Sequence, residues 1–147
     1  MRFKIVRIAK DLSLPKYMSA EAAGMDLYAA VETPTELAFG QIVAVPTGIR
    51  ISIPPEYEAQ IRPRSSLSLK GIVMPNAPGT IDADYRGEVR VILINLSNEP
   101  FKIERGMRNA QMVINRIERV KFEEVDELDG TVRGESGFGS TGIGARE

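Results

Sequence analysis

Gly79-Thr80-Ile81-Asp82-Ala83-Asp84-Tyr85-Arg86-Gly87-Glu88 is the stretch around which the chain is organised. Two carboxylates stand two residues apart, an aromatic residue and an arginine follow them, and glycines bracket the set. The next residues, Val89 to Ile94, are almost all β-branched or long aliphatic, which predicts a buried strand. We therefore interpret the charged stretch as a turn or hairpin leading into a rigid strand, where chemistry is often placed. The alternative is an acidic hairpin turn with a solvated arginine.

Glycine and proline punctuate the whole chain. Its 147 residues include 13 Gly and 9 Pro, spread from end to end. This spacing leaves little room for long helices and favours many short strands. The length fits one domain with a proper hydrophobic core.

The chain contains no Cys and no His. Disulfides, thiolate nucleophiles, zinc fingers and a Ser-His-Asp triad are therefore impossible within one chain. A general base must be Asp, Glu, Lys or Tyr, and a metal must be held by oxygen ligands, which points to Mg²⁺ or a similar hard cation. The net charge of −1 gives no bulk attraction to nucleic acid or membrane.

The first residues contain no long apolar run, so we expect neither a signal peptide nor a membrane span. The absence of Cys is compatible with a cytoplasmic location, which is the expectation here. Strands are predicted from alternation and β-branched content, whereas 22–30 has the small apolar composition of a helix but contains Gly24, which argues against one. The predicted strands cover 2–8, two short segments within 41–53, 57–62, 72–74, 88–95 and 110–122.

Pro63-Arg64-Ser65-Ser66-Leu67-Ser68-Leu69-Lys70-Gly71 has the signature of a short helix. Proline and two serines mark its beginning, and Gly71 closes it. Exposed amides at this beginning, together with Arg64 and Lys70, favour an anion site. An ordinary capped turn is the alternative.

The last part of the chain is rich in glycine with one aromatic residue, Phe138. It contains a literal G-x-G-x-x-G from 137 to 142, which is no dinucleotide fingerprint because no βαβ unit surrounds it. The segment suits either a disordered tail or a lid. In a lid, Phe138 would stack on a planar base while Arg133, Ser140 and Thr141 hold phosphates.

Taken together, these segments resemble the trimeric dUTP pyrophosphatase family over nearly the whole chain and in the right order. The resemblance implies an all-β, jelly-roll-like β-barrel subunit with one short helix and a flexible Gly-rich C-terminal tail. It divides the chain into a catalytic core, 1–132, and a lid, 133–147. The segments that carry the resemblance are Ala23 to Leu27, Pro63 to Lys70, Asn76 to Glu88, Gly106 to Gln111 and Arg133 to Gly142.

The family hydrolyses dUTP to dUMP and pyrophosphate, which limits uracil in DNA and supplies dUMP for thymidylate synthesis. By resemblance, this chain forms a homotrimer with active sites between subunits, and each tail closes over a neighbour's site. Neither nucleic acid nor membrane is implied as a partner. Mg²⁺ would bridge the substrate phosphates mainly through water, with no direct protein ligand.

The resemblance also assigns residue roles. Asp82 would be the general base for a water that attacks the α-phosphorus, and Tyr85 would pack on the deoxyribose. Asp26 would organise the phosphate end rather than bind substrate. The remaining substrate contacts implied are Asn76, Gly79 and Ile81 on uracil; Arg64, Ser65, Ser66 and Gln111 on phosphates or the attacking water; and Arg133, Phe138, Gly139, Ser140 and Thr141 in the tail.

Three positions depart from the family pattern. Ser66 and Ser136 stand where Gly is more usual, and Asn109 replaces a residue that is usually aliphatic. Two rival functions remain. The related dCTP deaminases carry a Glu three residues before the asparagine that resembles Asn95, and here that position is Ile92, which cannot shuttle protons. A non-enzymatic relative that binds a nucleotide or a protein is the other rival.

Overall fold

The computed structural model describes residues 2–138, and these are almost entirely β. One short helix, α1 (Ser65–Ser68), interrupts a succession of short strands. The strands are β1 (Lys4–Arg7), β2 (Lys16–Tyr17), β3 (Met25–Tyr28), β4 (Thr35–Leu37), β5 (Ile42–Pro46), β6 (Ile49–Ser52), β7 (Tyr57–Pro63), β8 (Ile72–Val73), β9 (Gly79–Ile81), β10 (Arg90–Asn95), β11 (Phe101–Ile103) and β12 (Arg108–Arg116).

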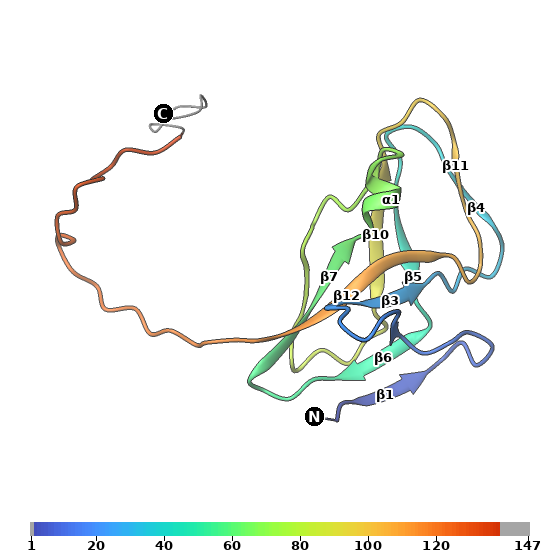
Figure 1. Cartoon of the computed structure of the whole chain (residues 1–147), viewed down its shortest axis with the longest axis horizontal. Helices are drawn as coiled ribbons and strands as arrows, with labels where there is room; N and C mark the ends of the chain where they lie inside the picture. The colour runs from blue at the N-terminus through green and yellow to red at the C-terminus, as the bar shows by residue number, and fades with distance from the viewer. Residues whose placement is uncertain (1, 139–147) are drawn as a thin grey trace.

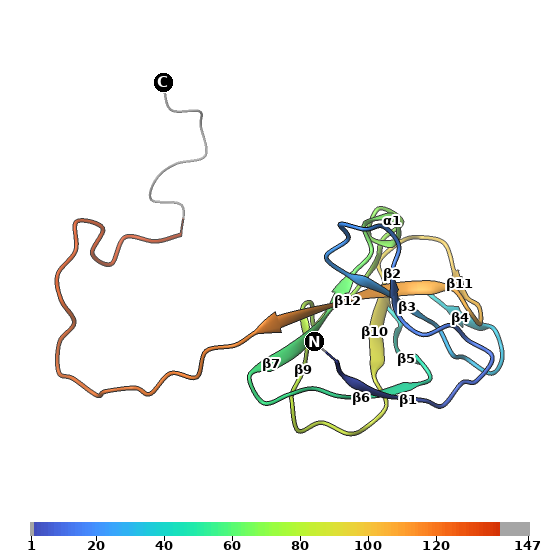
Figure 2. The ribbon, with the colours of Figure 1, turned by 60° about the horizontal axis from the view of Figure 1, so that its bottom comes forward.

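The strands pair antiparallel in four small sheets that wrap around a common core (Figures 1 and 2). The largest sheet has the order β2-β3-β12-β7-β9, and a second has the order β5-β10-β8. Two further pairs, β1-β6 and β11-β4, lie beside them. The predicted all-β, jelly-roll-like fold with one short helix is confirmed.

Aliphatic residues from both larger sheets fill the core. Leu27, Ile61 and Met112 come from the five-stranded sheet, and Val91 and Leu93 come from β10. Residues on β10 alternate between buried and partly exposed, as the pleat of a strand requires. The aliphatic run after the charged stretch therefore forms the predicted buried strand.

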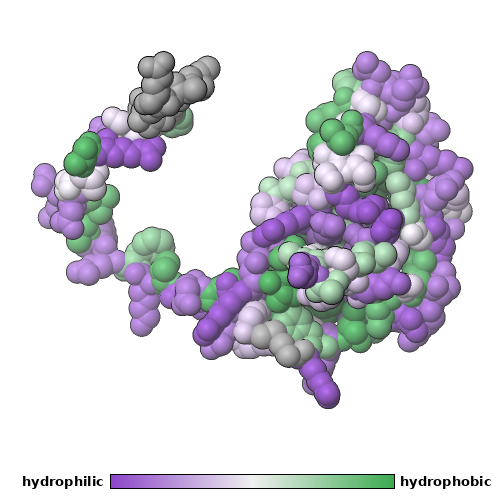
Figure 3. Space-filling model, viewed as in Figure 1, coloured by the Kyte–Doolittle hydropathy of each residue, from purple (hydrophilic) through white to green (hydrophobic). Residues whose placement is uncertain are grey.

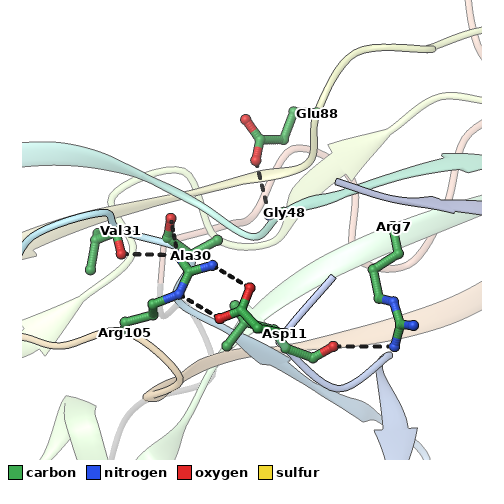
Figure 4. Close-up of polar contacts among 8 residues, drawn as sticks. Arg7, Asp11, Ala30, Val31, Gly48, Glu88 and Arg105 are labelled. Carbon is green, nitrogen blue, oxygen red and sulfur yellow. Dashed lines mark hydrogen bonds and ion pairs between the residues drawn. The ribbon is translucent and has the colours of Figure 1, made fainter. Parts of the chain in front are cut away.

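Gly48, just before β6, connects the β1-β6 sheet to Glu88 at the end of the charged stretch through a hydrogen bond (Figure 4). Its φ is +70°, and a Cβ there would overlap Ala9, so only glycine fits without strain. The Gly48 amide donates to Oε1 of Glu88 at 2.9 Å, and its carbonyl accepts from Ile8 at 2.7 Å.

The Arg105 guanidinium joins the loop after β1 to the loop after β3 (Figure 4). Its Nη2 and Nε atoms donate to the two carboxylate oxygens of Asp11 at 2.7 and 2.8 Å. Its Nη1 donates to the carbonyl oxygens of Ala30 and Val31. This bidentate geometry is the strong form of an arginine–carboxylate pair.

Several local expectations need correction. The segment 22–30, whose composition left a helix possible, forms β3, because a β-rich neighbour, β12, pairs with it. The segment 12–20, which lies outside the predicted strands, includes the two-residue strand β2. Strands β4 and β11 carried no sequence signal that we read. The last predicted strand, 110–122, begins at 108 and ends at 116.

Beyond β12 the chain leaves the body as an extended arm, residues 118–138 (Figure 1). The Ile117 amide still donates to the Glu56 carbonyl at 3.0 Å, but the residues after it are exposed, with Gly137 half-buried. Apolar side chains recur along the arm between charged ones (Figure 3), including Val120, Phe122 and Leu128. Among residues 2–138, no helix is long and apolar enough to cross a membrane.

Candidate active site

A buried carboxylate lies at one end of the five-stranded sheet. Asp26 on β3 is only 2% exposed, so its charge requires close partners. Arg108 on β12 supplies one, with Nη1 2.9 Å from Oδ2 of Asp26. Arg64 supplies the other, with Nε 3.4 Å from Oδ1, an ion pair without hydrogen-bond geometry.

Arg64 also contacts the backbone of the neighbouring strand. Its Nη1 donates to the carbonyl of Arg108 at 3.2 Å. One carboxylate thus orders two guanidinium groups, one from the residue that precedes α1 and one from β12, and each guanidinium group has five N–H donors. The two positive charges of Arg64 and Arg108 are therefore held close together beside Asp26.

Gln111 lies beside Asp26 on the same face of the sheet. It stands opposite Asp26 on β3 and opposite Arg62 on β7 in the strand register, and residues directly opposite point to the same face. Gly24 makes room for it, because a Cβ at Gly24 would come 3.3 Å from the Cβ of Gln111. Asp26, Arg64 and Gln111 are therefore brought together as the expected phosphate end requires.

The two serines open the helix that follows β7. Ser65 and Ser66 are the first residues of α1, and both are exposed. Arg64 precedes them in an extended conformation and makes no side-chain cap. Gly71 follows the helix with a φ of +76°. The predicted short helix with a closing glycine is confirmed, and it sets the serines next to Arg64.

The expected uracil-reading hairpin runs alongside β7. Gly79 in β9 stands opposite Ile61, and Ile81 stands opposite Ala59. Asn76 is exposed in the turn before β9, and its Nδ2 would lie 3.1 Å from a Cβ at Gly79. A side chain at position 79 would thus press on the Asn76 amide, and glycine lets that amide lie against the hairpin without a shift.

Asp82 and Tyr85 lie in the tight turn that follows β9. The amide of Tyr85 donates to the Asp82 carbonyl at 3.1 Å, and its hydroxyl donates to the Glu88 carbonyl at 3.0 Å. A Cβ at Gly87 would overlap the Tyr85 ring. The aromatic ring therefore lies against Gly87, and Tyr85 is 43% exposed. The exposed Asp82 lines a hollow of about 650 Å³.

The two halves of the expected site lie at opposite ends of β7. Asp82 follows Ile81, which stands opposite Ala59 near the beginning of β7. Ser65 comes six residues after Ala59, just beyond the other end of β7. At about 3.3 Å per strand residue, the two are separated by roughly 20 Å. In Figure 1, the arrow of β7 points toward α1, and Figure 2 shows β9 beside β7. One chain does not bring Asp82 to the serines.

Arg133 and Phe138, the expected lid residues that the structure describes, lie on the arm, away from both halves. Arg133 donates from Nε to the Ser136 carbonyl at 2.8 Å, and Phe138 is fully exposed. Gly139, Ser140 and Thr141 lie outside the described residues.

Two arginines of this sheet were missed in the sequence. Arg108 binds Asp26, and Arg62 faces Gln111 across the β7–β12 pair. The sequence does show that both arginines lie close to expected site residues, because Arg108 precedes Gln111 by three residues and Arg62 precedes Arg64 by two. Residues 2–138 contain no group of three or more acidic side chains that could hold a metal ion.

Known proteins match this arrangement. The dUTPase family model matches residues 10–142. Deoxyuridine 5'-triphosphate nucleotidohydrolase from Caldanaerobacter subterraneus subsp. tengcongensis is 54% identical over 144 residues, covering 97% of each chain. The protein of the same name from Rickettsia felis is 58% identical over 132 residues, covering 89% of each.

Solved structures with a similar fold are also dUTPases. The Staphylococcus bacteriophage 80alpha dUTPase with dUPNHPP superposes with a TM-score of 0.86 at 26% identity, covering 97% of this chain and 99% of that one. The D95N dUTPase of S. aureus phage phi11, described with a structural Mg(II) ion, superposes with a TM-score of 0.77 at 21% identity, covering 87% and 99%. The fold, the family model and the named relatives together define a nucleotide hydrolase. The chain belongs to the dUTPase family.

Proposed function

We propose that this protein hydrolyses dUTP to dUMP and pyrophosphate. The observation that carries the proposal is the meeting of Asp26, Arg64 and Gln111 beside the serines of α1. Family membership and relatives named for the same reaction support it. In the cell, this reaction would limit uracil in DNA and supply dUMP for thymidylate synthesis.

Asp82 is the proposed general base. The chain has no His and no Cys, so a carboxylate is the natural group to accept a proton from water. An ordinary carboxylate is a weak base at neutral pH, so positioning and charge stabilisation must supply much of the rate. Asp82 would orient the water for attack on the α-phosphorus, with the bond to the pyrophosphate oxygen breaking as the new bond forms.

Substrate selection would rest on the hairpin and on Tyr85. Backbone groups from Asn76 to Ile81 would read the edge of uracil, with the Asn76 side chain assisting. Tyr85 lies against Gly87 and would pack on the deoxyribose, leaving no room for a 2′-hydroxyl. Arg133, Ser140 and Thr141 would hold the terminal phosphate while Phe138 stacks on uracil.

Three copies of the chain would complete the site. The roughly 20 Å between Asp82 and Ser65 supports a site shared between copies, and the family resemblance implies that the copies are three. One copy would supply Asp82 and Tyr85, and another would supply Asp26, Arg64, Ser65, Ser66 and Gln111. The arm, residues 118–138, leaves the body and would carry the lid to a neighbouring copy. A trimer would therefore be required for turnover.

Mg²⁺ is the proposed cofactor. Within residues 2–138 no acidic cluster can cage a metal, so the ion would take its ligands from phosphate oxygens and water. When bound, it would neutralise charge on the phosphates. The residues of the chain would meanwhile orient the phosphates through Arg64 and the serines.

Substrate choice tests the proposal most directly. Purified protein with Mg²⁺ is given dUTP, dCTP or UTP, and dUMP, pyrophosphate and ammonia are measured. Cytosine presents an edge with the wrong donors and acceptors, which typically costs several kcal/mol, or roughly a thousandfold in rate. We expect rapid dUMP formation and poor turnover of dCTP and UTP. Ammonia release from dCTP at a rate comparable to dUTP cleavage would favour the deaminase instead, and no turnover at all would favour the non-enzymatic binding protein.

A further inference from the structure

Arg62 is a cation at the phosphate end of the site that has no assigned role. It lies near the end of β7, two residues before Arg64, and is exposed. In the strand register it stands directly opposite Gln111 of β12. Its guanidinium group therefore starts from the sheet face that also carries Gln111 and Asp26.

A ladder of hydrogen bonds along β7 holds Arg62 in place. Its Nη2 and Nε atoms donate to Oε1 of Gln60 at 2.7 and 3.2 Å. Gln60 in turn donates from Nε2 to Oε1 of Glu58 at 2.6 Å. These residues alternate along the strand and so share one face. The ladder restricts a side chain that would otherwise lose considerable rotamer entropy on binding a ligand.

The ladder orders Arg62 without neutralising it. Its partner is the neutral amide oxygen of Gln60, and among residues 2–138 no carboxylate lies within ion-pair distance of its guanidinium group. The two nearby arginines, Arg64 and Arg108, already share the single charge of Asp26. With Arg62 one strand away from Gln111, three guanidinium groups face two carboxylates, Asp26 and the Glu58 at the end of the ladder. This leaves excess positive charge, which suits a polyanion such as a phosphate chain.

We infer that Arg62 binds the pyrophosphate portion of the substrate, beyond the α-phosphate. The inference rests on the proposed function, in which Gln111 contacts the α-phosphate or the attacking water and Arg64 holds phosphates. Neighbouring strands lie about 4.8 Å apart, so the Arg62 side chain starts one strand away from Gln111. Once its guanidinium group leaves Gln60, its length lets it reach the next phosphate group.

Binding measurements separate this role from a general one. Isothermal titration of the trimeric protein with Mg²⁺ uses three probes: the imido analogue dUpNHpp, inorganic pyrophosphate and dUMP. For Arg62→Gln we expect dUpNHpp and pyrophosphate to bind about tenfold to a hundredfold more weakly, as for loss of a hydrogen-bonded charge. Binding of dUMP should change by less than about twofold, because dUMP lacks the phosphates that Arg62 contacts.

Kinetics give a second, independent readout. Because Arg62 holds substrate and transition state alike, Arg62→Gln should raise KM for dUTP about tenfold and change kcat by less than about threefold. Arg62→Lys should recover part of the affinity, since it keeps the charge but loses the planar fork. Gln60→Leu keeps Arg62 and removes its acceptor, so its effect should be smaller than that of Arg62→Gln.

Arg50→Gln is the matched control. Arg50 is also an exposed strand arginine, but it lies on β6 in the two-stranded sheet, so all three affinities should stay unchanged. Equal weakening of dUMP and pyrophosphate by Arg62→Gln would overturn the inference, as would unchanged pyrophosphate binding or dissociation of the oligomer. If wild-type protein fails to hydrolyse dUTP, the proposed function itself fails, whatever Arg62 does.

Discussion

Arg108 donates a hydrogen bond of 2.9 Å from Nη1 to Oδ2 of Asp26, a residue 82 positions earlier in the chain. The contact is possible because β3 and β12 are neighbours in the five-stranded sheet. The hydrogen bond joins two segments of the family resemblance, Ala23 to Leu27 and Gly106 to Gln111. It also holds the Arg108 guanidinium group in place near Gln111.

Replacing Asp26 by Asn should destabilise the protein. The change leaves Arg64 and Arg108 without their shared counter-charge, and removing one partner of a buried pair costs about 3–5 kcal/mol. Because the Arg108 side chain is 42% exposed and can turn to water, we expect a smaller loss of about 2–3 kcal/mol in the free energy of unfolding. Urea denaturation measures it, and Asp126→Asn on the exposed arm should change stability by less than about 0.5 kcal/mol.

Asp82→Asn should separate catalysis from folding. Asp82 is exposed in the turn after β9, so the substitution should leave the fold and dUpNHpp binding intact. Loss of a general base should lower kcat by roughly a hundredfold to ten-thousandfold. Stopped-flow measurement of dUTP cleavage tests this, with Asp84→Asn as the neighbouring control. Near-normal turnover of Asp82→Asn would falsify the assignment of the base.

Truncation after Gly130 should remove activity but not structure. The arm makes no contact that the core needs, since its residues are exposed, and a lid completes a site by excluding water. Mixed oligomers of the truncated chain and Asp82→Asn should regain activity if the tail serves a neighbouring copy. A truncated protein that unfolds, or that turns over dUTP normally, contradicts the lid.

Asn109 should lower the free energy of unfolding of the protein. It is 1% exposed, and neither polar atom of its side chain has a partner within the described residues. It lies where the β3–β12 register shifts between Arg108 and Ala110. An unsatisfied buried amide costs about 1–3 kcal/mol, so Asn109→Val should raise the free energy of unfolding by about that amount. Thermal denaturation measures the change, and lower stability would show that the amide has found water.

The Asp11–Arg105 pair should make stability depend on pH in acid. Hydrogen bonding from Arg105 lowers the pKa of Asp11 from 3.8 to about 2, and Glu32 also faces Arg105 electrostatically. A carboxylate with a depressed pKa stabilises the fold above its unfolded pKa, and this contribution disappears as pH falls from about 4 to about 2.

Asp11→Asn tests this relationship. The variant should melt at a lower temperature than the wild type at pH 6, and the difference should shrink as pH falls through that range. Asp126→Asn, on the exposed arm, is the matched control and should melt like the wild type throughout this range. A gap between wild type and Asp11→Asn that stays constant down to pH 2.5 would contradict the role of the ion pair.

Local sequence determined most strands and the punctuation between them. The β-branched run at 88–95 became β10, and Gly71 closed α1 as expected, because alternation and positive φ are local properties. Segment 22–30 shows the limit of prediction from local sequence. Its small residues fit a helix by composition, and pairing with β12 decided that they form a strand.

The sequence by itself also determined which chemistry is available, since the absence of His and Cys leaves carboxylates and arginines to do the work. Only the tertiary structure decided which of them meet. Strand register set Arg62 and Asp26 on either side of Gln111 and added Arg108. The same register put Asp82 and Ser65 at opposite ends of β7. Strand pairing joins residues far apart in sequence, so no local pattern records it.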